Sequence, residues 1–147
     1  MVEIARKSKT LTTSWILLLV LGLLLVLISL GSLYVAHFGA PDVLVQGVTV
    51  DKLAEVDPRL PTVLRGRRAT AASLSLSLGI LVAWIAATAY RRGERWAWPA
   101  LLVSVGVGSV ISLLRYVTLE TTLGLAPAGV ALGVLVVALL IGYKDFH

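Results

Sequence analysis

Four long apolar runs without a single charge constrain this chain more than any other feature. They are residues 11–36 and the runs between Arg68 and Arg91, between Arg95 and Arg115, and between Glu120 and Lys144. A helix that rises about 1.5 Å per residue needs about 20 residues to cross a hydrocarbon layer of about 30 Å. Each run is close to this length or longer, so each predicts a membrane-crossing helix.

The same runs indicate the fold class. Lipid offers no hydrogen bonds, and within one span only a helix closes all of its own backbone hydrogen bonds. The apolar residues are continuous and do not alternate with polar ones, which excludes β-barrel strands. We predict an all-α integral membrane protein, an antiparallel four-transmembrane-helix bundle forming one domain of residues 1–147. The expected spans are about 11–36, 69–90, 96–115 and 121–143.

The first run also has to be weighed against a secretory signal peptide, because basic residues precede both. The run is longer than the apolar core of a signal peptide, about 7–15 residues, and no clear small-x-small cleavage site follows it. An uncleaved signal-anchor helix is the better interpretation.

The expected loop 37–68 is long enough to have structure of its own. Leu53, Val56, Leu60 and Val63 recur at spacings of three and four, as on one face of a helix. Two prolines, Pro58 and Pro61, interrupt this pattern. The sequence therefore predicts a short, broken amphipathic segment, lying outside the cell on the membrane surface or over the helix ends.

Basic residues near the spans indicate the orientation, since they favour the cytoplasmic face. The N-terminal segment and the turn 91–95 fall on one face, and the basic group 65–68 falls on the other. The two faces carry similar numbers of basic residues, but the first helix usually dominates the choice. We expect a multi-pass protein of the cytoplasmic membrane with both termini in the cytoplasm.

Composition excludes several classes of function. Hydrophobic residues make up 58% of the chain and charged residues 14%, and the net charge of +5 comes from short basic groups beside apolar runs. This pattern favours contact with lipid headgroups over nucleic-acid binding. The chain has no Cys and only two His residues, at opposite ends of the sequence, so we expect no metal site and no cofactor. No catalytic motif is present, and no charge lies deep in a span.

Small residues recur every four positions in three of the runs. The sets are Ala71, Ser75, Gly79, Ala83 and Ala87; Ser104, Gly108 and Ser112; and the pairs Gly129–Gly133 and Ala138–Gly142. A spacing of four places such residues on one helix face, where two backbones can approach closely. We expect them to mark the inner seams of the bundle, and a homodimer seam on the second helix is the alternative.

Aromatic residues flank the basic turn. Trp96 and Trp98 follow Arg95 directly, and Trp15 and Tyr90 are expected at similar depths, as in an interfacial belt. Trp84 lies near the middle of the second run instead. It is a candidate for the wall of an apolar ligand cavity, with a packed or lipid-facing position as the alternative.

A polar cluster is the candidate binding site. In the predicted topology His37, Asp42, Arg115 and Glu120 meet at the outer membrane face, where they could hold an anionic headgroup or a small polar ligand. The structural alternative is that Arg115 pairs with Glu120 and that Glu120 stabilises the positive N-terminus of the fourth helix. An enzyme acting on a lipid would have only His37, Asp42 and Glu120 as its acid–base set, and we expect no catalysis.

The segment from Ala89 to Trp98, Ala-Tyr-Arg-Arg-Gly-Glu-Arg-Trp-Ala-Trp, resembles a turn found in small four-span prokaryotic membrane proteins that are loosely DoxX-like. The resemblance covers this turn, its flanking helices and the four-span plan. It implies a four-helix bundle in a prokaryotic cytoplasmic membrane and supplies no catalytic residues.

Two functions from different classes remain. The first is a non-enzymatic membrane protein that acts through helix–helix contacts, as an accessory subunit of a larger complex or as a homo-oligomer. The second is a binder or carrier of a lipid, quinone or other small amphiphile. The expected partners are membrane lipids and other membrane-protein chains or further copies of this one.

Overall fold

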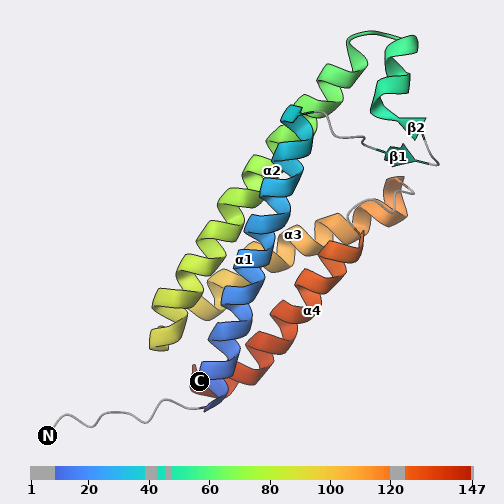
Figure 1. Cartoon of the computed structure of the whole chain (residues 1–147). Helices are drawn as coiled ribbons and strands as arrows, with labels where there is room; N and C mark the ends of the chain where they lie inside the picture. Colours follow the sequence, from blue (N-terminus) through green and yellow to red (C-terminus); the bar gives the residue numbers. More distant parts are fainter. Residues whose placement is uncertain (1–8, 39–42, 46–47, 120–124, 147) are drawn as a thin grey trace, which may run out of the picture. The chain divides into compact units, whose positions relative to one another are not determined.

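The computed structural model describes residues 9–38, 43–45, 48–119 and 125–146. The helices are α1 (Lys9–Phe38), α2 (Leu60–Ile85), α3 (Ala97–Leu119) and α4 (Leu125–Gly142) (Figure 1). A π-helix, η2 (Ala86–Tyr90), continues α2, and two 3-10 helices are η1 (Val50–Glu55) and η3 (Tyr143–Asp145). The strands β1 (Val43–Val45) and β2 (Val48–Thr49) form a short antiparallel pair.

The chain divides into two compact units. Residues 1–23 and 80–147 form the first, which we name the α3–α4 unit, and residues 24–79 form the second, which we name the loop unit. Helices α1 and α2 contribute to both.

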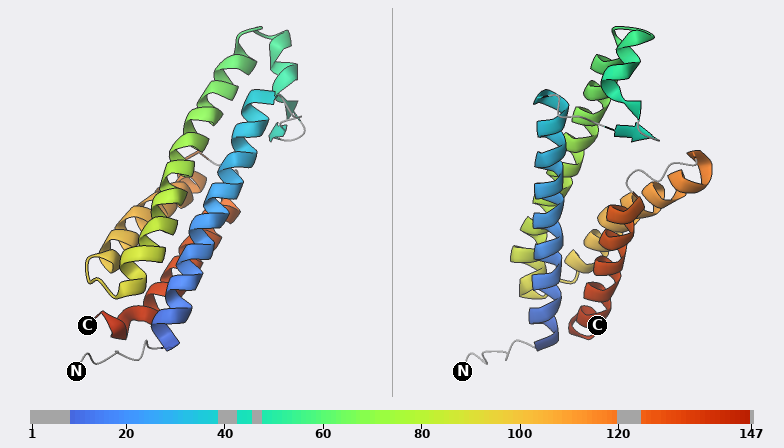
Figure 2. Two further views of the ribbon diagram at one scale, coloured as in Figure 1. Left: turned by 60° about the vertical axis from the view of Figure 1, so that its left-hand side comes forward. Right: turned by 45° about the vertical axis from the view of Figure 1, so that its right-hand side comes forward.

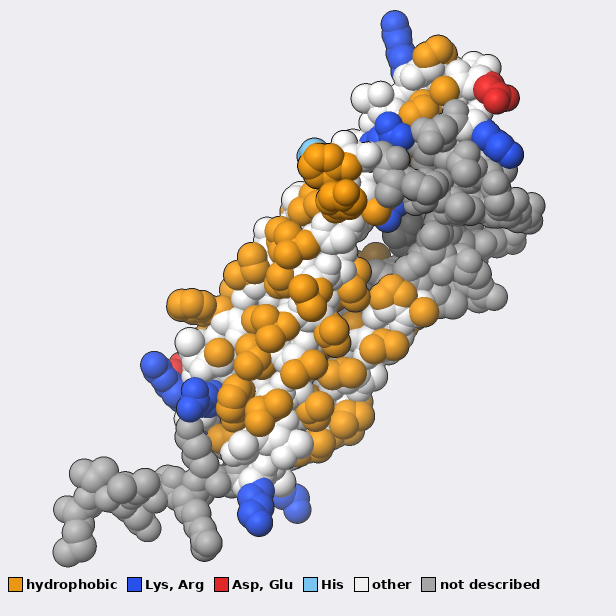
Figure 3. Space-filling model, in the orientation of Figure 1, with side chains coloured by type: hydrophobic (Ala, Val, Ile, Leu, Met, Phe, Trp, Pro, Cys, Tyr) orange, Lys and Arg blue, Asp and Glu red, His pale blue; other side chains and the backbone are white. Residues whose placement is uncertain are grey.

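Within the described residues, four helices are long and apolar enough to cross a membrane. They comprise Lys9–Phe38, Leu60–Tyr90, Ala97–Leu114 and Ala126–Asp145. Hydrophobic side chains cover much of the helical surface displayed in Figure 3, and Lys and Arg side chains gather toward helix ends. The prediction of four long apolar helices is therefore confirmed.

The second helix begins at Leu60, well before the expected start of its span at residue 69. Asp57 stabilises the turn that leads into this helix. Its carboxylate accepts a hydrogen bond from the backbone N–H of Arg59 at 2.8 Å, and its backbone carbonyl accepts one from the N–H of Leu60 at 3.1 Å. Pro61 then lies in the first turn, where a backbone N–H has no helical partner to lose. Of the two prolines, only Pro58 separates the helical segments of the first loop.

The loop unit contains more structure than the sequence predicted. Val43 pairs with Thr49 and Val45 with Val48 in the strand pair, which leads directly into η1. The apolar face predicted for this segment is not buried as a whole, since the side chains of Val56 and Val63 are 80% and 55% exposed. Within this unit Arg68 donates a hydrogen bond from Nε to Ser32 Oγ at 3.1 Å, which ties α2 to α1.

In the α3–α4 unit, helices α3 and α4 lie side by side (Figure 2). The buried residues of α3 recur every four positions: Ala97, Leu101, Val105 and Ser109. Those of α4 follow the same helical period: Ala131, Leu135, Ala138 and Leu139. This spacing places each set on one helix face, so each helix buries a single stripe.

The positions of the small residues correct the expectation that they all mark inner seams. Ala138 and Gly142 are buried, as expected. Gly108, Gly129 and Gly133 are exposed, and a Cβ at any of the three would meet no other group within 4 Å. The spacing of four was a correct indication of a shared face, but for Gly129 and Gly133 that face points outward.

Gly22 and Gly142 lie where neighbouring helices approach very closely. A Cβ on Gly22 of α1 would lie 2.6 Å from the backbone nitrogen of Ala83 in α2. A Cβ on Gly142 would collide with Tyr90 Oη and lie 2.8 Å from Ser14 Oγ. Both contacts lie in the α3–α4 unit, and both require a residue without a side chain.

We expect Gly142→Ala to destabilise the protein by about 1–3 kcal/mol, because the added methyl group overpacks a buried site. Tyr90 cannot easily move away, since its side chain is 0% exposed. Gly133→Ala is the matched control on the same helix, and its better helix propensity should leave stability unchanged or raised by up to about 1 kcal/mol. Thermal unfolding of both variants in detergent tests this, and equal stabilities would contradict the close contact at Gly142.

Candidate functional site

The polar cluster predicted from the sequence falls largely outside the described residues. Asp42, Glu120 and the side chain of Arg115 belong to the parts that are not described. His37 is exposed near the end of α1, and its Nδ1 lies 2.9 Å from the carbonyl oxygen of Leu33 in the preceding turn. A site shared by these residues stays a prediction.

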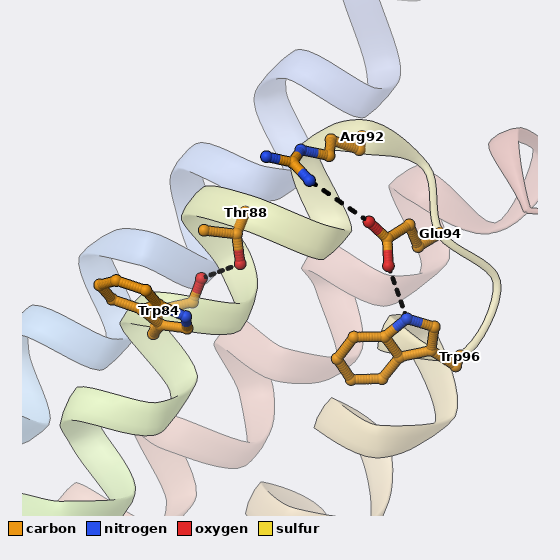
Figure 4. Close-up of polar contacts among 5 residues, drawn as sticks. All are labelled: Trp84, Thr88, Arg92, Glu94 and Trp96. Atoms are coloured by element: carbon orange, nitrogen blue, oxygen red, sulfur yellow. Dashed lines mark hydrogen bonds and ion pairs between the residues drawn. The ribbon is translucent and has the colours of Figure 1, made fainter.

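Trp84 lies on an outward face of α2. Its side chain is 69% exposed, and its carbonyl oxygen accepts a hydrogen bond from Thr88 Oγ1 at 2.6 Å (Figure 4). An indole that is exposed near the end of α2, on a helix apolar enough to cross a membrane, favours the lipid-facing alternative over the cavity wall.

The described part of the chain concentrates polar and aromatic contacts elsewhere, around the turn between η2 and α3. Tyr90, the last residue of the π-helix, is fully buried. Its hydroxyl lies 2.6 Å from Ser14 Oγ, and Ser14 Oγ lies 2.6 Å from the carbonyl oxygen of Ala138. Ser14 has one proton to donate and gives it to the carbonyl, so the Tyr90 hydroxyl donates to Ser14.

This hydrogen-bonded chain joins α1, the end of α2 and α4. We name it the Tyr90 cluster, comprising Ser14, Tyr90, Ala138, Gly142 and Phe146. The ring of Phe146 packs on that of Tyr90 with centroids 4.6 Å apart. Beside it, Thr10 Oγ1 donates to Asp145 Oδ2 at 2.7 Å, which holds η3 against the start of α1. The cluster acts as a structural lock, because the two buried hydroxyls are satisfied by each other and by the carbonyl of Ala138.

The turn that follows Tyr90 has a defined helix-ending geometry. Gly93 adopts a φ of 78°, and its N–H donates to the carbonyl of Tyr90 at 2.9 Å. The N–H of Glu94 donates to the carbonyl of Ala89 at 3.1 Å. These two bonds and the left-handed glycine form a Schellman motif, which glycine favours because it has no Cβ. The motif explains why Gly93 stands between Arg92 and Glu94.

The carboxylate of Glu94 contacts two neighbouring side chains of this turn, those of Arg92 and Trp96. One carboxylate oxygen accepts a hydrogen bond from Trp96 Nε1 at 2.6 Å, and the other lies 3.9 Å from Arg92 Nη1 (Figure 4). The guanidinium of Arg91 lies 5.1 Å from the ring centroid of Trp15 on α1, at cation–π distance. Arg95, in contrast, has no ion-pair partner among the residues that the structure describes.

A hollow of about 390 Å³ opens beside Arg95. It is lined by Arg95, Trp98, Pro99 and Phe146. Trp98 is held in place, since its Nε1 donates to the carbonyl of Leu139 at 3.1 Å and its ring meets Tyr143 edge-on with centroids 6.0 Å apart. The hollow therefore has rigid aromatic walls and one cationic group.

Sequence reasoning placed Tyr90 in an interfacial belt, and the structure corrects this by burying it. Trp96, which is 53% exposed, remains available for the interface. Ser14, Gly142 and Phe146 were not singled out as partners of Tyr90. The pair Ala138–Gly142 was the available signal, because two small residues on one face leave room for a large side chain.

The described residues contain no group of three His, Asp or Glu side chains that could hold a metal ion. Comparisons with protein-family models, curated proteins and solved structures found no match to this chain. The resemblance of the Tyr90–Trp98 turn to DoxX-like proteins therefore remains a prediction.

A double-mutant cycle on Ser14 and Tyr90 tests the lock. We expect Ser14→Ala to cost about 1–3 kcal/mol of stability, because it leaves a buried hydroxyl without its acceptor. Tyr90→Phe should cost about 0.5–1.5 kcal/mol, the net contribution of one hydrogen bond. The double variant should be less destabilised than the sum of the two, and strict additivity in denaturant unfolding would show that the hydroxyls do not interact.

Proposed function

We propose that this chain is a non-enzymatic, multi-pass protein of the cytoplasmic membrane that acts through contacts between membrane helices. It would serve as an accessory subunit of a larger complex or associate with further copies of itself. The observation that carries this proposal is the outward position of Gly129 and Gly133 on α4, with open space where a Cβ would be.

The physical argument starts from what drives helix association in lipid. Lipid tails are as apolar as leucine, so burial of apolar surface gives no advantage, and close backbone packing supplies the attraction instead. Glycines separated by four residues form a flat stripe that permits such packing. On α4 the helix face buried within the chain is a different one, the face of Leu135 and Ala138. The Gly129–Gly133 face is therefore available to a second helix.

The surrounding outward surface suits the same role. Val130, Val137 and Leu140 are exposed on α4 at 61%, 52% and 67%. Aliphatic side chains beside a glycine stripe supply the ridges that fill the grooves of a partner helix. The described α4 helix has no polar side chain, so its contact with a partner helix would depend on close packing alone.

Replacing both glycines with leucine tests the proposal. Gly129→Leu with Gly133→Leu should weaken association in native membranes by at least about tenfold, because two side chains then hold the helices apart. Val103→Leu is the matched control, because Val103 is a 60% exposed valine on α3, outside the Gly129–Gly133 face. Chemical cross-linking in membranes followed by native gel electrophoresis measures the associated fraction.

The cross-linking experiment either supports or contradicts the proposed helix contact. Association lost in the double-leucine variant and kept in Val103→Leu supports the proposal, whether the associated species contains only this chain or other chains too. A wild-type protein that is monomeric throughout, or a double-leucine variant that associates normally, contradicts it. Thermal unfolding of the variants confirms that the chain itself is intact, since both glycines have open space around them.

The proposed orientation places both termini and the turn 91–95 in the cytoplasm. It is supported by the basic residues Arg91, Arg92 and Arg95 in a short segment between two apolar helices. We expect a reporter enzyme that is active only outside the cytoplasm to be inactive when fused within this turn or after His147. The same reporter fused within residues 43–59 should be active, and activity at either cytoplasmic position would overturn the orientation.

A further inference from the structure

The hollow beside Arg95 lies where α3 begins. Helix α3 starts at Ala97, so Arg95 precedes the apolar helix while Trp98 and Pro99 lie in its first turn. In a chain that crosses a membrane, the boundary between a basic turn and an apolar helix lies at the depth of the lipid headgroups. A molecule in this hollow would contact both the cationic side chain of Arg95 and the rings of Trp98 and Phe146.

The walls of the hollow are already ordered. Trp98 is hydrogen-bonded to the carbonyl of Leu139, and Phe146 is only 5% exposed because it packs on Tyr90. A binding surface that is fixed in advance loses little conformational entropy when it is occupied. Its volume of about 390 Å³ lies within the range of about 300–1,000 Å³ that is usual for small-molecule sites.

The charges beside the hollow favour an anion. Arg92 is near the carboxylate of Glu94 and Arg91 lies over Trp15, whereas no described carboxylate pairs with Arg95. Lys144 is exposed and stands two residues before Phe146 in the sequence. The planar guanidinium of an arginine offers parallel N–H donors that match two oxygens of a phosphate.

We propose that this hollow is a binding site for an anionic phospholipid. Arg95 holds the phosphate group, and the glycerol and the first acyl carbons lie against Trp98, Pro99 and Phe146. Lipids with a net negative charge are preferred over zwitterionic ones, because the lining offers a guanidinium for the phosphate and no carboxylate for the headgroup cation of a zwitterionic lipid. The site is separate from the Gly129–Gly133 face, so its failure in a test leaves the proposed helix contacts untouched.

Competition between two lipids tests this proposal on the full chain. The protein is exchanged into mixed micelles with equimolar phosphatidylglycerol and phosphatidylcholine, and native mass spectrometry counts the lipids retained. We expect wild type to retain phosphatidylglycerol in excess and Arg95→Gln to lose about fivefold of that preference, the usual effect of one basic residue near anionic lipid. Arg95→Lys should lose less, because the charge remains while the fork of donors is gone.

Arg92→Gln is the matched control. It removes the same charge from the same exposed turn but does not line the hollow. A preference that falls in Arg95→Gln and persists in Arg92→Gln supports a site. Equal losses in the two variants would show a general surface potential and overturn the proposal, as would equal retention of the two lipids by wild type.

Inorganic phosphate distinguishes a lipid headgroup from a soluble anion. The lipid proposal expects phosphate at millimolar concentration to leave the retained phosphatidylglycerol in place, since a free ion makes no contact with Trp98 and Phe146. Displacement of the lipid by phosphate alone would identify a soluble-anion site and overturn the assignment to lipid. Unchanged thermal unfolding of Arg95→Gln, whose side chain is exposed, shows that the loss is not due to misfolding.

Discussion

The contact among Tyr90, Ser14 and the carbonyl of Ala138 holds the rest of the α3–α4 unit in place. It is a buried chain of two hydrogen bonds of 2.6 Å each between three helices whose other buried side chains are almost all apolar. In surroundings with no water to compete, a hydroxyl without a partner is costly, so each member holds the others in position. The close approach at Gly142 and the packing of Phe146 both depend on where Tyr90 lies.

The π-helix at the end of α2 is the local device that brings Tyr90 to this position. A π-turn inserts one extra residue into a helix and rotates the residues that follow, and such turns recur at functional sites. Here the rotated residue packs inward, and the Schellman turn at Gly93 then leads the chain into α3. The same turn exposes Arg95 beside Trp98, so the structural lock and the proposed lipid site share one segment of chain.

Small residues serve two purposes on α4, and their surroundings distinguish them. Gly142 is necessary within the chain because Tyr90 and Ser14 occupy the space that a side chain would take. At Gly129 and Gly133 no described residue outside the helix's own backbone lies within 4 Å of where a Cβ would be, so nothing in the described part of the chain requires a glycine there. A glycine inside a helix costs about 1 kcal/mol relative to alanine, and a contact with another helix is a physical reason to retain two of them on an outward face.

The sequence by itself determined the four long apolar helices, because the length of each uncharged run and the need to satisfy backbone hydrogen bonds leave no other regular structure. Only the tertiary structure decided which helix faces are buried. A spacing of four places Gly129 and Gly133 on one helix face, and it does the same for Ala138 and Gly142. The spacing does not tell which of the two pairs faces the interior of the protein. Tyr90 likewise has the chemistry of an interfacial residue, and its burial required Ser14, which lies 76 residues away in the chain, as a partner. The candidate site at His37, Arg115 and Glu120 depended on topology alone, whereas the hollow at Arg95 was found only from the folded positions of Trp98 and Phe146.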